Sequence, residues 1–344
     1  MDIAGALKRI VEGGHLSADE AYDVMLQVIG GEAQDVQVAG LLTALRMRGE
    51  SVEEIVGFAR AMRDKALRIQ VDRQPLVDTC GTGGDGAHTF NISTAAAFVV
   101  AGAGVAVAKH GNRSVTSQCG SADVLEELGY NLNMPPEMVK QCIEDIGFGF
   151  LFAPQFHPAM RNVAHIRRQL GIRTVFNILG PITNPANITG QTMGVFSPHL
   201  SERIARVLCS LGLRRAFVVH SHDGLDEVSP CAPTLISELS HGDVRTYELV
   251  PSEIGFGRGS LDELRISSRE DGARLLLGVL SGDVHGCPRD SVLLNAALGI
   301  VAGELCDNIA DGIKAAEEAI DSGRALQCLK RVIQFSEKVS GAAG

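Results

Sequence analysis

The sequence predicts an α/β protein in two parts, a small helical domain and a large α/β domain with a mainly parallel central sheet. The chain has 344 residues, a length typical of about two domains. The first 70 residues show helical periodicity only, whereas short β-branched segments that alternate with helical ones begin at Leu76. With 45% hydrophobic residues, a chain of this length buries a large core without disulfides or a structural metal.

Residues 1–70 are predicted to form a bundle of about four helices. Two capping boxes of the form Ser-x-x-Glu, at 17–20 and 51–54, mark helix starts. The apolar residues that follow lie at helical spacing, with one stripe at Val24, Val28 and Ile29 and another at Val36, Leu41, Leu42 and Leu45.

The predicted sheet begins with the apolar segment 76–80, which ends in a glycine-rich loop. Further strands are predicted at 105–108, 148–152, 191–196 and 216–220, with helices starting at Thr94, Ala122, Pro136, Pro158 and Ser201. This alternation implies right-handed crossovers and parallel strands. Residues 234–250 are predicted to form an antiparallel hairpin that turns at 241–243, and helices are predicted at 269–280, 292–302 and 309–320.

Composition opposes nucleic acid and membranes as partners. The chain carries 31 basic and 41 acidic residues, a net charge of −10, and only 4% aromatic residues. A nucleic-acid-binding protein needs the opposite charge and aromatic side chains on which bases stack. No apolar run approaches the roughly 20 residues of a membrane span.

The eight cysteines contain no C-x-x-C pair, so zinc and redox spacings are absent and we expect reduced thiols. The first residues lack a basic segment followed by an apolar one, so we expect a cytoplasmic protein.

Two long windows, 86–122 and 146–201, contain no Asp or Glu but keep basic residues. These basic residues are Lys109, His110 and Arg113 in the first window and Arg161, Arg167, Arg168 and Arg173 in the second. In an acidic protein this pattern indicates surfaces that accept an anion. The alternative is that buried elements simply lack charges.

The loop Gly81-Thr-Gly-Gly-Asp-Gly86 follows the first predicted strand and carries four glycines in six residues. It matches G-x-G-x-x-G by letter, but the acidic residue that a dinucleotide site needs about 20 positions later is missing. A glycine-rich backbone beside a helix that starts near Asn91 still favours phosphate binding. The alternative is an ordinary strand-to-helix turn.

Two more polar loops are predicted at the same edge of the sheet, because each follows a parallel strand. Lys109–Ser114 follows the second strand, and Asp223-Gly-Leu-Asp-Glu227 follows the strand at 216–220. Adjacent carboxylates among anion-binding loops repel the anion unless a cation lies between them, and oxygen ligands together with phosphate favour Mg²⁺. The alternative is a solvated acidic turn.

Five motifs in order resemble the anthranilate phosphoribosyltransferases over nearly the whole chain: 81–85, 91–94, 109–113, 173–185 and 223–227. The resemblance implies the nucleoside phosphorylase/phosphoribosyltransferase type of fold. The helical domain would then cover 1–70 with a return segment near 165–185, and the α/β domain 71–164 and 186–344. It also implies a homodimer formed through the helical domain. Cys119 and the segment 229–232 depart from the family pattern.

The resemblance further implies transfer of the phosphoribosyl group from phosphoribosyl pyrophosphate to the amine of anthranilate, a step of tryptophan biosynthesis. Phosphoribosyl pyrophosphate would be held by Gly81, Gly84, Asp85, Thr89, Asn91, Ile92, Ser93, Thr94, Lys109, His110, Gly111, Asn112, Arg113, Ser114, Val115, Thr116, Ser117 and Ser121. Mg²⁺ would be held by Ser93, Asp226 and Glu227, and anthranilate by Asn112 and Arg167. Among these residues, Lys109 is expected to stabilise the leaving group. No general base is assigned, although His110 is a candidate for one.

Periodicity independently favours Arg167 over its neighbour. Arg167 shares a helical stripe with Met160, Val163 and Leu170, whereas Arg168 falls on the stripe of Arg161 and His165. An inward guanidinium needs an anionic partner, which the carboxylate of anthranilate would supply. The alternative is an arginine whose stem packs while its head reaches solvent.

Two rival functions stay open at this point. A pyrimidine nucleoside phosphorylase shares the architecture, but the 173–185 segment and the Asp226–Glu227 pair fit the transferase better. A non-catalytic relative that binds nucleic acid is disfavoured by the sequence pI near 5.5.

Overall fold

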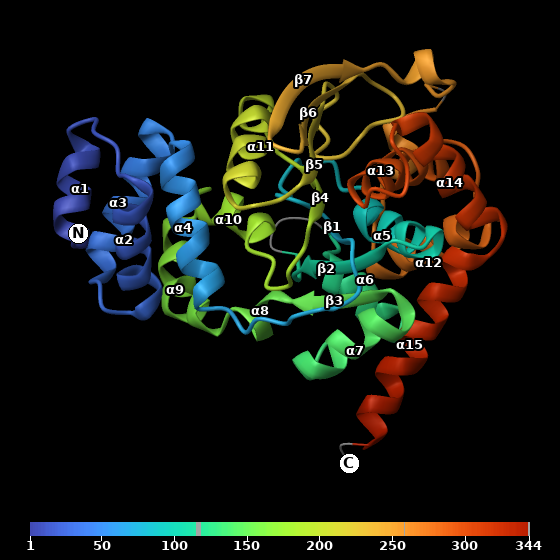
Figure 1. Cartoon of the computed structure of the whole chain (residues 1–344), viewed down its shortest axis with the longest axis horizontal. Coiled ribbons are helices and arrows are strands. Elements are labelled where there is room, and N and C mark those ends of the chain that lie inside the picture. The colour runs from blue at the N-terminus through green and yellow to red at the C-terminus, as the bar shows by residue number, and fades with distance from the viewer. Residues whose placement is uncertain (115–117, 258, 343–344) are drawn as a thin grey trace.

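The computed structural model describes residues 1–114, 118–257 and 259–342. It consists of a helical bundle beside a seven-stranded sheet that is covered by helices (Figure 1). The predicted fold class is confirmed.

The bundle contains α1 (Ile3–Val11), α2 (Ala18–Gly30), α3 (Asp35–Arg48) and α4 (Val52–Asp64). Both predicted capping boxes are formed, at the starts of α2 and α4. One predicted core residue is wrong, because Val36 is 73% exposed. The buried stripe of α3 starts instead at Val38, which lies three, four and seven residues before Leu41, Leu42 and Leu45.

The sheet has the strand order β3-β2-β1-β4-β5-β6-β7. Its strands are β1 (Leu76–Gly81), β2 (Ala106–Gly111), β3 (Phe148–Phe152), β4 (Gly190–Gly194), β5 (Arg215–Ser221), β6 (Thr234–Ser240) and β7 (Asp243–Leu249). The first five strands run parallel, and β6 and β7 form the predicted antiparallel hairpin. The carboxyl ends of β1, β2, β4 and β5 therefore lie at one edge, where the polar loops emerge.

The helices that follow β1, two of which return to the bundle, keep the predicted order. They are α5 (Ile92–Ala103), α6 (Ser121–Glu127), α7 (Pro136–Ile146), α8 (Ala153–Phe156), α9 (Arg161–Leu170), α10 (Phe176–Ile182), α11 (Ser201–Ser210), α12 (Arg269–Ser281), α13 (Cys287–Ala302), α14 (Ile309–Asp321) and α15 (Arg324–Ala342). Helices α8, α10 and α15 were not predicted. The core of this part lies between the sheet and α5 and α13, which pack on β1 and β4 respectively, while α11 packs on β5 and β6.

The chain returns to the bundle after β3. Helix α9 packs against α2 and α3, and α10 packs against α4, so these two helices lie beside the bundle in Figure 1. These contacts support the proposal that the segment near 165–185 belongs with the helical domain.

Candidate active site

The acidic loop 223–227 lies directly on the glycine-rich loop. The backbone amide of Gly83 donates a 2.6 Å hydrogen bond to Asp226 Oδ2. A side chain at Gly81 would place its Cβ only 2.6 Å from the same oxygen, and one at Gly194 would overlap the Asp226 backbone. The ends of β1 and β4 therefore carry glycine because the acidic loop passes within contact distance of both strands.

The carboxyl groups of Asp85, Asp226 and Glu227 lie close enough beside the glycine-rich loop for their charges to affect one another. Asp226 is buried, and burial, together with the nearby charge of Asp85, raises its pKa to about 7. Burial and the charge of Asp226 also raise the pKa of Glu227 well above its usual value. The motif is therefore not a solvated acidic turn.

This oxygen-rich site fits Mg²⁺. A divalent cation relieves the mutual repulsion of the carboxylates, and hard oxygen ligands select Mg²⁺. No group of three or more His, Cys, Asp or Glu side chains in the described residues is arranged to hold a metal ion. Asp226 and Glu227 would supply part of the coordination of a cation, and oxygens of a bound phosphate are ligands of the same hard type.

Lys109 lies under these loops and not in a loop itself. Strand β2 extends to Gly111 and not to Ala108 as predicted, because Lys109 and His110 pair with Phe150 and Leu151 of β3. The Lys109 ammonium is buried, donates to the Thr79 carbonyl oxygen, and lies 3.4 Å from Ser93 Oγ. Burial lowers its pKa, an effect that Asp78 opposes.

His110 is buried and neutral at pH 7. Its Nδ1 lies 3.1 Å from the Gly180 carbonyl oxygen, which only accepts hydrogen bonds, so Nδ1 carries the proton. Its Nε2 is buried without a hydrogen-bond partner among the described residues. Burial and the neighbouring His157 lower the pKa of His110 to about 3, which makes it a weak base.

The sequence reasoning missed a buried pair that supports these residues. Asp78 lies in β1, fully buried, and accepts hydrogen bonds from Asn184 Nδ2 at 2.8 Å and from the His110 amide at 3.2 Å. Asn184 Nδ2 also donates to the Ala108 carbonyl oxygen at 2.8 Å. An Asp inside an otherwise apolar strand was the signal that could have found this pair.

The loop after β2 is organised by another missed residue, Asp123 of α6. Its buried carboxylate accepts from the amides of Ser114 and Gly120, at 3.0 and 2.9 Å. Arg113 pairs with Asp123 at 3.0 Å and with Glu126 at 2.7 Å. The window 86–122 contains no acid, but α6 brings two carboxylates from outside this window to the basic segment.

Asn112 and Ser121 lie at the two ends of the same loop, directly after β2 and at the start of α6. Asn112 is exposed, and Ser121 Oγ donates to its carbonyl oxygen at 3.3 Å. A Cβ at Gly111 would overlap Ser121 Oγ and would meet the Phe150 ring at 2.6 Å, so this position has no room for a side chain. Val115, Thr116 and Ser117, predicted to bind phosphate, lie outside the described residues.

Helix α5 starts at Ile92, next to Asn91 at its N-cap position and two residues before the predicted start at Thr94. Ser93 is partly exposed, whereas Ile92 and Thr94 are buried. Ile92 can therefore contact a ligand through its backbone amide and not through its side chain. Asn91 Oδ1 and Thr94 Oγ1 are buried without hydrogen-bond partners among the described residues. Thr89 forms an isolated bridge to Arg265. The start of α5 lies beside the ends of β1 and β2, because Ser93 contacts Thr79 and Lys109, and a helix start favours an anion.

Arg167 and Arg168 differ as the periodicity predicts. Arg168 is exposed, whereas Arg167 is partly buried with its guanidinium 5.1 Å from the centre of the Phe176 ring. Burial lowers the pKa of Arg167, and none of the described residues forms an ion pair with it. This guanidinium thus lies beside an aromatic ring without a protein carboxylate.

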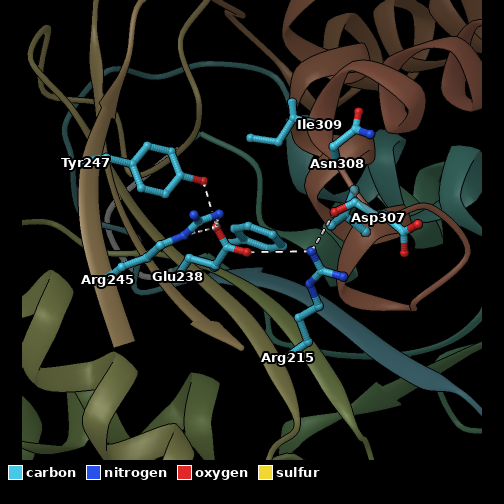
Figure 2. A pocket seen from close by; sticks show the side chains of 9 residues that line it. Arg215, Glu238, Arg245, Tyr247, Asp307, Asn308 and Ile309 are labelled. Carbon is cyan, nitrogen blue, oxygen red and sulfur yellow. Dashed lines mark hydrogen bonds and ion pairs between the residues drawn. The ribbon is translucent and has the colours of Figure 1, made fainter. Parts of the chain in front are cut away.

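A separate cavity of about 270 Å³ lies away from these loops, between β5–β7 and the start of α14. Figure 2 shows Arg215, Arg245 and Tyr247 converging on Glu238 within it. None of the residues that line this cavity belongs to the three loops, so the cavity is not part of the site described above.

The chain is similar to known proteins over nearly its whole length. Residues 4–66 match the helical bundle domain of a glycosyl transferase family, and residues 73–326 match the α/β domain of a glycosyl transferase family. The anthranilate phosphoribosyltransferase of Pelotomaculum thermopropionicum is 53% identical over 98% of each chain. That of Symbiobacterium thermophilum is 50% identical over 97% of each chain.

Solved structures agree. The anthranilate phosphoribosyltransferase of Thermus thermophilus has a TM-score of 0.92 at 45% identity, covering 96% of this chain and 99% of that one. The Saccharomyces cerevisiae protein, in complex with PRPP and Mg, has a TM-score of 0.88 at 31% identity over 98% of both chains. By sequence and by structure, the chain belongs to the anthranilate phosphoribosyltransferase family.

Proposed function

We propose that the three loops at the carboxyl edge of the sheet carry out the reaction of this family. The phosphoribosyl group of phosphoribosyl pyrophosphate passes to the amine of anthranilate, giving N-(5-phosphoribosyl)anthranilate and pyrophosphate, in tryptophan biosynthesis. The observation that carries this assignment is the hydrogen bond from the Gly83 amide to Asp226, which joins an anion-binding loop to a pair of cation-binding carboxylates.

Asp226, Glu227 and Ser93 would hold Mg²⁺, and the bound ion would neutralise charge that develops on the departing pyrophosphate. The glycine-rich loop and the amides at the start of α5 would bind the phosphate oxygens directly. Lys109 supports this arrangement from below, because its ammonium contacts both Ser93 and the end of β1. A fixed positive charge beneath the site favours the transition state without requiring reorganisation.

Anthranilate would place its carboxylate on Arg167 and its ring near Phe176, with Asn112 as a further contact. Its aryl amine is neutral at pH 7 and becomes acidic only as the bond to ribose C1 forms, so a strong base is not required. The low pKa of His110 agrees with this, since its Nε2, which has no hydrogen-bond partner among the described residues, holds a proton only at acidic pH. We therefore assign His110 a positioning role.

The test is a fluorescence assay of anthranilate consumption with phosphoribosyl pyrophosphate and Mg²⁺, in which each component is omitted in turn. Consumption that requires all three supports the assignment. Release of thymine from thymidine and phosphate, with no loss of anthranilate, would indicate a nucleoside phosphorylase instead.

We further propose a homodimer formed through the helical bundle. Val11 on α1 and Val36 and Met47 on α3 are 69%, 73% and 83% exposed, an apolar set that supports burial against a second copy. Sedimentation velocity of the protein and of a Met47→Asp variant tests this proposal, because a dimer that dissociates in the variant supports it.

We also propose that the protein works in the cytoplasm, supported by the eight cysteines, all of which are free thiols. No helix in the described part of the chain has the length and apolar character that a membrane crossing needs.

A further inference from the structure

Two cysteines lie in contact beside the acidic loop. Cys231 Sγ and Cys287 Sγ are 3.4 Å apart although the residues are 56 positions apart in the chain. Cys231 belongs to the segment 229–232, which departs from the family pattern, and Cys287 is the first residue of α13. Neither residue has a role in the proposed reaction.

The placement of these sulfurs suits a covalent bond between them. A disulfide has a sulfur–sulfur distance of about 2.05 Å, so the two atoms must approach by roughly 1.4 Å. Cys231 lies in an irregular connection between β5 and β6 and is partly exposed, whereas Cys287 is 1% exposed at the start of a 16-residue helix. The loop can therefore move toward the helix, and an oxidant reaches Cys231 first.

We propose that Cys231 and Cys287 form a disulfide when the protein meets a hydroperoxide. The thiolate of Cys231 attacks a peroxide oxygen, giving a sulfenic acid and, after protonation, water. The sulfur of Cys287 then displaces the sulfenic oxygen, which leaves as a second water with the remaining thiol proton. Two thiols are oxidised, one hydrogen peroxide is reduced to two waters, and a thiol reductant reverses the change.

The charged groups around Cys231 and Cys287 affect how fast these two thiols are oxidised. Asp223 precedes Cys231 in the same loop, Glu263 approaches from the turn after 260, and Asp290 lies in the first turn of α13. Burial and these carboxylates raise the pKa of both thiols. The pair is therefore expected to stay reduced without an oxidant and to react faster as the pH rises.

The disulfide would act on the acidic loop, an inference that rests on the proposed function. The Cys231 amide donates to Ser229 Oγ at 3.0 Å, and this hydroxyl donates to Asp223 Oδ2 at 2.5 Å. Two hydrogen bonds of 2.9 Å also join Val228 to Asn295 of α13. A shift of Cys231 toward α13 is thus transmitted to both ends of the segment that carries Asp226 and Glu227, and the oxidised protein should require several-fold more Mg²⁺.

The experiment treats the reduced full-length protein with hydrogen peroxide at pH 7 and pH 9, blocks the remaining thiols with N-ethylmaleimide, and analyses tryptic peptides by mass spectrometry. Residues 216–245 and 275–289 form peptides with one cysteine each. We expect these two peptides to be joined, faster at pH 9, and separated by dithiothreitol. Cys231→Ser should abolish the link, and Cys306→Ser, at another partly buried cysteine, should keep it.

Oxidation of Cys231 to a sulfinic acid with no link to Cys287 would overturn the proposal. This readout requires no activity, so it is independent of the proposed function. Activity is then measured against Mg²⁺ in peroxide-treated wild type and peroxide-treated Cys231→Ser. A higher Mg²⁺ requirement in the linked protein alone supports the coupling to the acidic loop, and equal requirements refute that coupling.

Discussion

Asp226 connects the two halves of the site through one carboxyl group. Its Oδ2 accepts a hydrogen bond from the Gly83 amide. Its pKa of about 7 shows that burial and the charge of Asp85 disfavour the ionised form. The site therefore holds a carboxylate that is more stable with a cation than without one.

Replacing Asp226 by Asn or Glu227 by Gln should lower Mg²⁺-dependent turnover by about 10²-fold or more, equivalent to about 2.7 kcal/mol in the barrier. The amide keeps the volume but removes charge from the cation. Initial rates across a Mg²⁺ titration measure this effect, and thermal melting checks the fold. Wild-type rates at limiting Mg²⁺ in both variants would refute the metal assignment.

Replacing Arg167 by Ala should weaken anthranilate binding about ten- to a hundred-fold, the value of one charge-assisted hydrogen bond at about 1.5 to 3 kcal/mol. Binding of phosphoribosyl pyrophosphate should change little. Arg168→Ala is the matched control, because Arg168 is the exposed neighbour on the same helix. The KM for each substrate gives the answer, and a larger effect from Arg168→Ala would contradict the assignment.

At this scale the sequence predicted residue types better than their partners. The periodicity of α9 separated Arg167 from Arg168, because one helix face settles that question. The sequence did not predict the hydrogen bond between Asn184 and Asp78. It did not predict the ion pair of Arg113 with Asp123 either, because each pair joins different elements. Such contacts depend on tertiary folding, which local spacing does not encode.

At the scale of elements, the β2 boundary shows the same limit. The polar residues Lys109 and His110 resemble a loop, yet they complete a buried strand because Thr79, Asp78 and Gly180 supply their polar contacts. Helix α15 was missed although Ala325, Leu329 and Val332 are buried at helical spacing. The parallel direction of the first five strands, in contrast, followed from the alternation of strands and helices.

Replacing Gly83 or Gly84 by Val should abolish binding of phosphoribosyl pyrophosphate while the protein stays folded. Their φ angles are +64° and +79°, which a β-branched residue adopts at a cost of about 1 to 3 kcal/mol. A side chain at Gly84 would also meet Arg173, whose guanidinium donates to the Gly84 carbonyl oxygen. Titration calorimetry with phosphoribosyl pyrophosphate and Mg²⁺ measures binding, alongside a melting curve.

Gly212 offers the control for this pair. It also has a positive φ, +88°, and a Cβ there would meet nothing within 4 Å, but it lies after α11 and away from the site. Gly212→Val should therefore cost similar strain without loss of binding. Wild-type affinity in Gly83→Val and Gly84→Val would mean that the loop is only a turn.

At the scale of the whole molecule, the pKa of Asp226 links stability to pH. Its folded-state pKa is about 7 against an ordinary 3.8, so between these values the folded protein binds more protons than the unfolded chain. Stability from this group is therefore present at low pH and decreases as the pH rises toward 7. Without Mg²⁺, Asp226→Asn should gain stability relative to wild type between pH 5 and 8.

Chemical denaturation at several pH values, without Mg²⁺, measures the free energy of unfolding of each protein. Taking the difference between variant and wild type removes the contribution of the other titrating groups. Adding Mg²⁺ with phosphoribosyl pyrophosphate at pH 8 should raise the stability of the wild type but not the stability of the variant. A stability difference that does not vary with pH would contradict the raised pKa.

The return of α9 and α10 to the bundle has a consequence for biosynthesis of the chain. The four N-terminal helices leave the ribosome first, but the surfaces of α2, α3 and α4 that α9 and α10 cover stay open until the ribosome has passed residue 182. By then β1, β2 and β3 have also been made, and Asn184, just after α10, joins two of these strands. The first-made domain is therefore completed only together with three of the seven strands, so nascent chains shorter than this should expose apolar surface to chaperones.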